Sequence, residues 1–389
     1  MHDVLYRHGF DEAAGNFQEQ NFSAGGMGSD SVLAEAQDGS GTDNANFATP
    51  SDGRNPRMQM FLWQPDVTHD VVVGSATYAA TGAAFGPSLD STGITGPLVL
   101  VNDGVGTTSD ACEALPRGSL SGQLALVDRG TCNFTVKVKN AQGAGAIGTI
   151  VMNNQGGDAI FTMGGTDNTI RIPSVMVSQN SGAAIRGSLP AQGTARLKDP
   201  LLMIDGDLDA DIIYHEYGHG LTWRMIGNMS GPMSGAIGEG MSDAVAFLVN
   251  GDDRIAEYSF TNEGGLRRHP YTKYPGTYAS MTGAEVHDDG EIYAAIVWRL
   301  REEFIGAGVS LDVLWDYIVD GMNFTPSGPA VEDMRDGILV STTNAELGHE
   351  CLVWRSFAAF GVGEGASGTV DASGAIVVTE SITVPATCP

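Results

Sequence analysis

The chain has 389 residues, and its 47 acidic and 20 basic side chains give a formal net charge of −27 at pH 7. This charge argues against nucleic acid or an anionic membrane as a partner, because both favour clusters of Lys and Arg. Glycine accounts for 53 residues, about twice the usual share of ~7%, which favours tight turns and short strands, and charged residues at 17% are too few for a coiled coil or a disordered chain.

Three zones follow one another along the chain. Residues 1–69 are polar and rich in Gly and Asn, and they end in a strand over 58–63 with alternating apolar side chains. Residues 70–198 contain short strands, such as 97–101 and 124–127, and one predicted helix over 136–143. Residues 199–389 contain longer segments with helical periodicity. We therefore expect an α+β protein in which residues 70–198 form a separate domain.

The four cysteines form two pairs that are close in sequence, Cys112 with Cys132 and Cys351 with Cys388. Neither pair has the C-x-x-C spacing of a zinc ribbon or a redox motif, so we interpret them as two disulfides of an exported protein. Four buried thiols in a cytosolic protein are the alternative. The first residues lack a signal-peptide pattern, and no stretch reaches the ~18 apolar residues of a membrane span. Export therefore implies that an N-terminal leader is missing from this chain.

Four aspartates at alternate positions precede the first long helix of the third zone: Asp205, Asp207, Asp209 and Asp211. Alternating carboxylates in a loop with glycine are typical of calcium sites, which need about six to eight oxygen ligands. Aspartate is also favoured at a helix N-terminus, where it caps free N–H groups and interacts with the helix dipole. Calcium binding and helix capping both stay open as explanations.

A predicted helix over 208–225 contains the strongest chemical signal, the motif His-Glu-Tyr-Gly-His at positions 215–219. In a helix His215 and His219 stand one turn apart on the same face, with their Cβ atoms about 5–6 Å apart. Two imidazoles at this spacing can bind one zinc ion at ~2.0–2.1 Å. Glu216 is turned toward the expected position of a zinc-bound water, where it would act as a general base.

Zinc needs a third protein ligand from elsewhere in the chain. A histidine six residues after His219 would complete one known arrangement, but that position holds Met225. A second predicted helix, over 236–250, has Glu239 and Asp243 one turn apart beside an apolar run, which is unusual for a solvated face. We therefore predict that Glu239 is the third ligand and that Asp243 accepts a hydrogen bond from a ligating histidine. A surface acid is the alternative for Asp243.

These motifs resemble the fungalysin-type metallopeptidases, which are relatives of thermolysin. The resemblance covers most of residues 1–68 and 199–362, through the segments Tyr6–Gln18, Asp43–Pro50, Asp205–Asp209, His215–His219, Gly238–Asp243, Asp320–Met322 and Trp354–Ala358. It implies a thermolysin-like catalytic domain with a β-rich N-terminal lobe and a helical C-terminal lobe, one zinc ion, and protein or peptide substrates. In such enzymes the catalytic region begins further upstream, behind a propeptide, so the chain resembles a fragment of the mature domain.

The resemblance also implies roles that spacing alone does not assign. His287, at the start of a predicted helix, would donate a hydrogen bond to the oxyanion formed from the substrate carbonyl; a merely structural histidine is the alternative. Asn44 and Ala45 would lie on the edge strand that pairs with the substrate backbone. Arg267 would hold a substrate carbonyl, although the neighbouring Arg268 is equally available. Residues 228–235 contain no tyrosine, so a second partner for the oxyanion stays unassigned.

Residues 70–198 resemble the protease-associated domain, through Gly122–Phe134, Lys137–Ala146, Val151–Asn154 and Ile172–Val175. The resemblance implies an insertion between the two parts of the catalytic domain, residues 1–69 and 199–389, with Cys112 and Cys132 as its disulfide. Such a domain would contact substrate or a partner, or restrict access to the cleft. A spacer without such a role is the alternative.

Taken together, these features predict a secreted zinc-dependent endopeptidase that uses a zinc-activated water and Glu216 as the general base. Two other functions stay open at this point. The first is a catalytically inactive fragment that binds proteins through its protease-associated domain. The second is a two-zinc aminopeptidase, which would need carboxylates that bridge two metal ions.

Overall fold

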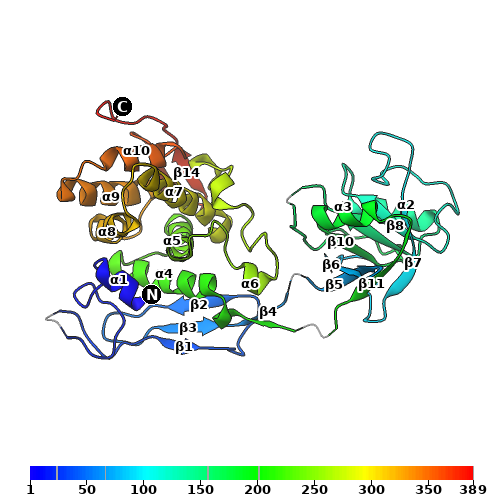
Figure 1. Cartoon of the computed structure of the whole chain (residues 1–389). Coiled ribbons are helices and arrows are strands. Elements are labelled where there is room, and N and C mark those ends of the chain that lie inside the picture. The colour runs from blue at the N-terminus through cyan, green and yellow to red at the C-terminus, as the bar shows by residue number, and fades with distance from the viewer. Residues whose placement is uncertain (23–24, 66, 156, 200–201, 389) are drawn as a thin grey trace. The chain divides into compact units, whose positions relative to one another are not determined.

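The structure, a computed structural model, describes residues 1–22, 25–65, 67–155, 157–199 and 202–388. The chain forms a mixed α/β protein with two compact units (Figure 1): unit 1 consists of Met1–Trp63, Asp205–Ala256 and Leu266–Pro389, and unit 2 of Gln64–Ile204 and Glu257–Gly265. Unit 2 thus includes the segment Glu257–Gly265, which lies outside the expected domain of residues 70–198. In this segment Thr261 Oγ1 accepts a hydrogen bond from Val67 N at 3.3 Å, and Asn262 Nδ2 donates one to Ile160 O at 3.2 Å.

Unit 1 begins with helix α1 (His2–Arg7) and a sheet with the strand order β1-β3-β2. Its strands are β1 (Leu33–Glu35), β2 (Ala45–Ala48) and β3 (Arg57–Met60). β3 pairs in parallel with β1 and antiparallel with β2, so β2 is an edge strand of this sheet in the described part of the chain. The strand expected over 58–63 is interrupted at Phe61. The following strand β4 (Leu62–Trp63) pairs with β12 (Ile204–Asp205).

The remainder of unit 1 is mainly helical. Its longer helices are α4 (Ala210–Met225), α5 (Pro232–Asn250), α7 (Val286–Gly306), α8 (Leu311–Gly321), α9 (Val331–Ala345) and α10 (Glu350–Ala358). Short 3-10 helices are η1 (Gly206–Leu208), η2 (Tyr271–Lys273), η3 (Tyr278–Ser280) and η4 (Met322–Phe324), and a hairpin of β13 (Ser367–Val370) and β14 (Ile376–Thr379) follows α10. α5 begins four residues before the predicted start, because Pro232 suits the first turn of a helix, where its missing N–H is not needed.

Glycines let three helices of unit 1, α4, α5 and α7, pack with their backbones in close contact. A Cβ at Gly218 of α4 would lie 2.7 Å from Ser242 Cα of α5, and a Cβ at Gly240 of α5 would lie 2.3 Å from Gly290 O of α7. Both separations are shorter than packed carbon atoms tolerate. α5 is therefore held tightly between α4 and α7, and in Figure 1 α4 also lies along strand β2.

Unit 2 is built around a closed barrel with the strand order β10-β6-β5-β11-β7-β8-β9. The strands are β5 (His69–Val73), β6 (Ala76–Thr81), β7 (Ile94–Leu100), β8 (Leu124–Asp128), β9 (Gly148–Met152), β10 (Ser174–Val177) and β11 (Ala191–Leu197). Apolar side chains such as Val71, Leu124 and Ile150 are fully buried in its core. Helices α2 (Phe134–Gly143), α3 (Gln179–Gly187) and α6 (Glu257–Phe260) complete this unit.

Both predicted disulfides are formed. Cys112 is bonded to Cys132 in unit 2, and Cys351 to Cys388 in unit 1. None of the described helices is at once long enough and apolar enough to cross a membrane.

Candidate metal centre

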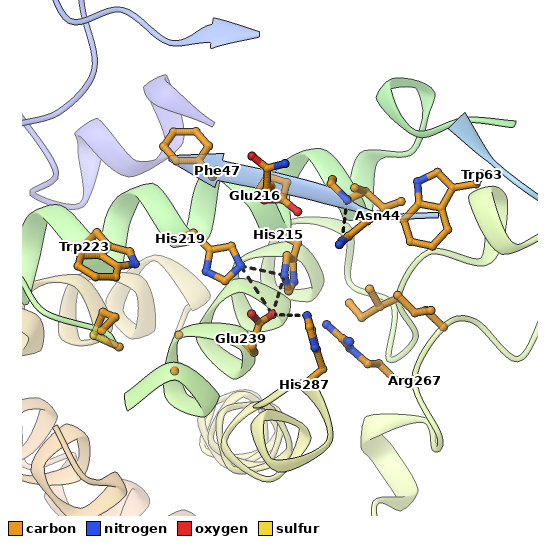
Figure 2. Close-up of a pocket in the computed structure, with 18 residues that line it drawn as sticks. Asn44, Phe47, Trp63, His215, Glu216, His219, Trp223, Glu239, Arg267 and His287 are labelled. Atoms are coloured by element: carbon orange, nitrogen blue, oxygen red, sulfur yellow. Dashed lines mark hydrogen bonds and ion pairs between the residues drawn. The ribbon is translucent and has the colours of Figure 1, made fainter. Parts of the chain in front are cut away.

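His215 and His219 from α4 and Glu239 from α5 point toward one another in a pocket of unit 1 (Figure 2). His215 Nε2 lies 3.2 Å from His219 Nε2 and 3.2 Å from Glu239 Oε2, and His219 Nε2 lies 3.6 Å from the same oxygen. Ligand atoms of a tetrahedral zinc ion, with bonds of ~2.0–2.1 Å, are about 3.3 Å apart. The three side chains therefore have the chemistry and the spacing of a zinc site.

The carboxylates of this group favour a positive charge at His215, whereas burial lowers the pKa of His219 to about 4. For His215 burial opposes protonation, but the Asp243 and Glu239 carboxylates beside its ring outweigh burial and raise its pKa to about 10. For Glu239 burial likewise opposes ionisation, yet the neighbouring His215, His219 and His287 rings lower its pKa to about 2. Carboxylates that stabilise an imidazolium also stabilise a bound cation in its place.

Asp243 lies one turn after Glu239 on α5 and is 1% exposed. Its Oδ1 accepts hydrogen bonds from His215 Nδ1 at 2.6 Å and from Arg267 Nη2 at 2.8 Å. Its Oδ2 accepts from Arg267 Nε at 2.7 Å and from the Tyr271 hydroxyl. Burial works against the charge, but Arg267 and His215 hold the pKa of Asp243 well below its usual range. An ionised Asp243 fixes the proton of His215 on Nδ1, so that Nε2 is left to bind a metal.

Glu216 projects from α4 into the same pocket and is buried. Its Oε2 has no hydrogen-bond partner among the described residues, and burial raises its pKa to about 7. A carboxyl group with such a pKa can take up and release a proton near neutral pH.

His287 enters the pocket from the first turn of α7 and is half-exposed. Its Nδ1 lies 2.7 Å from Glu285 Oε1, and its Nε2 lies 3.4 Å from Glu239 Oε2. The Glu285 carboxylate orients the ring, so that Nε2 faces the metal group.

The pocket encloses about 370 Å³ between β2 and the helices α4 and α5. Asn44 and Ala45 belong to its wall. Arg267 lines it as well, although two of its donor nitrogens bind Asp243. Arg268 is not among the lining residues and instead donates from Nε to Glu291 Oε2 at 3.2 Å. The contacts thus distinguish the two neighbouring arginines, whereas the sequence alone does not.

The pocket wall also contains residues that the sequence analysis did not identify. Beside the polar groups, it is lined by the apolar side chains of Phe47, Trp63, Ile212, Trp223, Met229, Ile255 and Leu266. Tyr271 was missed as well, because its contact with Asp243 joins residues that are 28 positions apart and belong to no shared motif. A pattern search finds residues at helical spacing but not partners that only the tertiary fold brings together.

Three of the four aspartates around the start of α4, Asp205, Asp209 and Asp211, accept hydrogen bonds from backbone or amide groups. Asp209 caps α4 by accepting a hydrogen bond from Asp211 N at 3.0 Å, and Asp205 accepts one from Asp207 N at 3.3 Å. Asp211 accepts hydrogen bonds from Asn250 Nδ2 at 2.5 Å and from Ala256 N at 3.0 Å. In the described residues the four carboxylates do not converge on one point as metal ligands do; the two groups that converge are His215, His219 and Glu239 in unit 1, and Asp103, Asp110 and Glu113 in unit 2.

Comparison with known proteins gives matches over most of the chain. The family model of the fungalysin metallopeptidases (M36) matches residues 1–366. The chain is 26% identical over 402 residues to an extracellular metalloproteinase of Aspergillus terreus, and 26% identical over 401 residues to extracellular metalloproteinase 2 of Trichophyton tonsurans. These alignments cover 94% and 93% of the chain but 42% of each relative, so the chain spans less than half of their length.

A match among solved structures is the zinc aminopeptidase BSAP of Bacillus subtilis, at 24% identity over 36% of this chain and 33% of that chain. Its TM-score of 0.28 is too low to support an inference about this chain.

Proposed function

Because the chain belongs to the fungalysin metallopeptidase family, we propose that it is part of a secreted endopeptidase that hydrolyses peptide bonds of extracellular proteins with one zinc ion. His215, His219 and Glu239 would hold the ion. The single observation that carries the proposal is the spacing of their three ligand atoms, 3.2, 3.2 and 3.6 Å. When bound, zinc supplies a Lewis acid that polarises the scissile carbonyl and acidifies a water molecule.

The side chains around the ligands have complementary tasks in this reaction. Glu216 removes a proton from the attacking water and passes it to the leaving amine, for which its pKa of about 7 is well placed. His287 donates a hydrogen bond from Nε2 to the oxygen on which negative charge develops, a contribution typically worth about 2.7–4 kcal/mol. Asp243 and Arg267 keep His215 in the orientation that binding requires.

Strand β2 would bind the substrate by β-strand addition. Its edge has no partner strand in the described part of the chain, and Asn44 and Ala45 lie in the pocket wall next to the metal group. An extended peptide placed along β2 gains main-chain hydrogen bonds regardless of its sequence. Such binding suits an endopeptidase, because it requires neither terminus of the substrate.

We propose further that unit 1 has the two lobes of a thermolysin-like catalytic domain and that residues 70–198 are an inserted protease-associated domain. The sheet β1-β3-β2 would belong to the first lobe and the helices from α4 onward to the second. The barrel of unit 2 and its disulfide Cys112–Cys132 support the second assignment. In the full-length precursor a propeptide would precede the catalytic region.

The test is cleavage of casein by the zinc-loaded chain, followed by mass spectrometry of the products, with metal content measured on the same sample. We expect internal cleavage and one zinc ion per chain. A single released N-terminal residue together with two zinc ions would indicate an aminopeptidase instead. One bound zinc ion without any cleavage would indicate a binding module.

A further inference from the structure

The pocket of unit 1 has two ends with different walls. Figure 2 shows the metal group in the middle, Trp63 and Arg267 at one end, and Phe47 and Trp223 at the other. The backbone runs between these ends from Asn44, just before strand β2, to Phe47 within it. Three residue steps of an extended strand cover about 10 Å. A peptide paired with β2 would therefore place side chains at both ends, one on each side of the scissile bond.

Trp223 is the outermost aromatic residue on the zinc helix at its end of the pocket. It follows His219 by one helical turn, so its indole lies on the same helix face as the ligands. With 38% of its surface exposed, the indole is accessible to a bound peptide. The exposed part of the ring is apolar surface that a bound side chain can cover.

The neighbouring wall at the Trp223 end is mainly apolar, although Asn46 of β2 also lines the pocket. A Cβ at Gly238 would lie 3.8 Å from Met229 Cε and 3.9 Å from His219 Nδ1, which places Met229 on the His219 side of the metal group. The titratable side chains that line the pocket are the three metal ligands, Glu216, Arg267 and His287. Beyond His219, the described part of this end therefore offers no charged group to a substrate.

We propose that Trp223 is a specificity-determining residue that selects an apolar, and above all an aromatic, substrate side chain on one side of the scissile bond. This inference rests on the proposed function. A flat ring in the substrate stacks on the indole in an offset or edge-to-face arrangement and removes apolar surface of both groups from water. A charged side chain at this position would lose hydration without gaining a partner.

The experiment compares peptides that differ only at the residues flanking the scissile bond, cleaved by the zinc-loaded chain. For the wild type we expect kcat/KM for Phe over Ala to be about tenfold or more at one flanking position. Trp223→Ala should bring this ratio close to one, whereas Trp223→Phe should retain most of it. Leu266→Ala, next to Arg267 at the opposite end, is the matched control and should change the preference only on the other side of the bond.

Each outcome decides the inference. Loss of the aromatic preference in Trp223→Ala alone, on one side of the bond, supports it. If the wild type cleaves the peptides but Trp223→Ala leaves its side-chain preference unchanged, or changes it equally on both sides of the bond, this inference is overturned. The proposed function then stands. A zinc-loaded wild type that cleaves no peptide overturns the proposed function and this inference together.

Discussion

The hydroxyl of Tyr271 provides a sensitive test of how the proposed metal ligands are held. Tyr271 is buried, and it donates to Oδ2 of Asp243, whose Oδ1 accepts from His215 Nδ1. Burial raises the pKa of Tyr271 far above its ordinary value, so the hydroxyl remains a donor at any relevant pH. Tyr271→Phe removes this donor and leaves the ring in place.

The expected cost follows from the charge of the acceptor. A hydrogen bond to a charged group contributes about 1.5–3 kcal/mol, and loss of such an outer partner typically weakens metal binding by about 10- to 100-fold. We expect Tyr271→Phe to lower the free energy of unfolding by about 1.5–3 kcal/mol. Zinc affinity should fall by about 10-fold, the lower end of its range, because Arg267 still binds Asp243. Denaturant unfolding and zinc competition with a chromophoric chelator measure the two quantities.

Tyr293 provides a matched control from the same unit. Its ring is fully buried on α7, and its hydroxyl has no hydrogen-bond partner among the described residues. Tyr293→Phe should therefore leave zinc affinity unchanged and should be neutral or slightly stabilising, because it removes a buried polar group that pairs with nothing. Equal effects of the two substitutions on stability and zinc affinity would refute the reasoning.

Three other predictions concern the base, the helix packing and the metal. Glu216→Gln should retain zinc but lose at least about 10²–10⁴-fold in kcat; undiminished turnover would contradict its role as base. Gly218→Ala should lower the free energy of unfolding by about 1–3 kcal/mol, because its Cβ would lie 2.7 Å from Ser242 Cα. The control Gly306→Ala, whose Cβ would have nothing within 4 Å, should not lower it. Denaturant midpoints compare the two variants, and equal midpoints would argue against close contact between α4 and α5. A zinc chelator such as 1,10-phenanthroline should abolish casein cleavage. Added calcium should not raise the melting temperature of the metal-free chain, since Asp209 and Asp211 act as hydrogen-bond acceptors around α4; a clear rise in melting temperature with calcium would instead indicate a calcium site.

Much of the candidate metal centre could be predicted because its residues repeat at helical spacing. In any helix, residues four positions apart lie on the same face. This spacing holds for His215 and His219 on one helix and for Glu239 and Asp243 on the next. The structure brings the first three together and hydrogen-bonds the fourth to His215. The close approach of the two helices depends on Gly218, whose role becomes visible only when the facing Ser242 is known.

Other features depend on tertiary contacts and leave no local pattern. Tyr271 reaches Asp243 across 28 positions, and Trp223 is recognisable as a pocket residue only once β2 lies opposite α4. The segment Glu257–Gly265 follows α4 and α5 in sequence, yet it packs in unit 2 through contacts such as that between Asn262 and Ile160. Composition and periodicity do not distinguish such a segment from its neighbours.

The most direct test of the central claim is to locate the metal in a crystal of the zinc-loaded chain from diffraction data on both sides of the zinc absorption edge. We predict one anomalous peak in this pocket, about 2.0–2.2 Å from the nearest atoms of His215, His219 and Glu239. A peak that lacks Glu239 as a ligand, or a second zinc ion bridged to the first, would contradict the account.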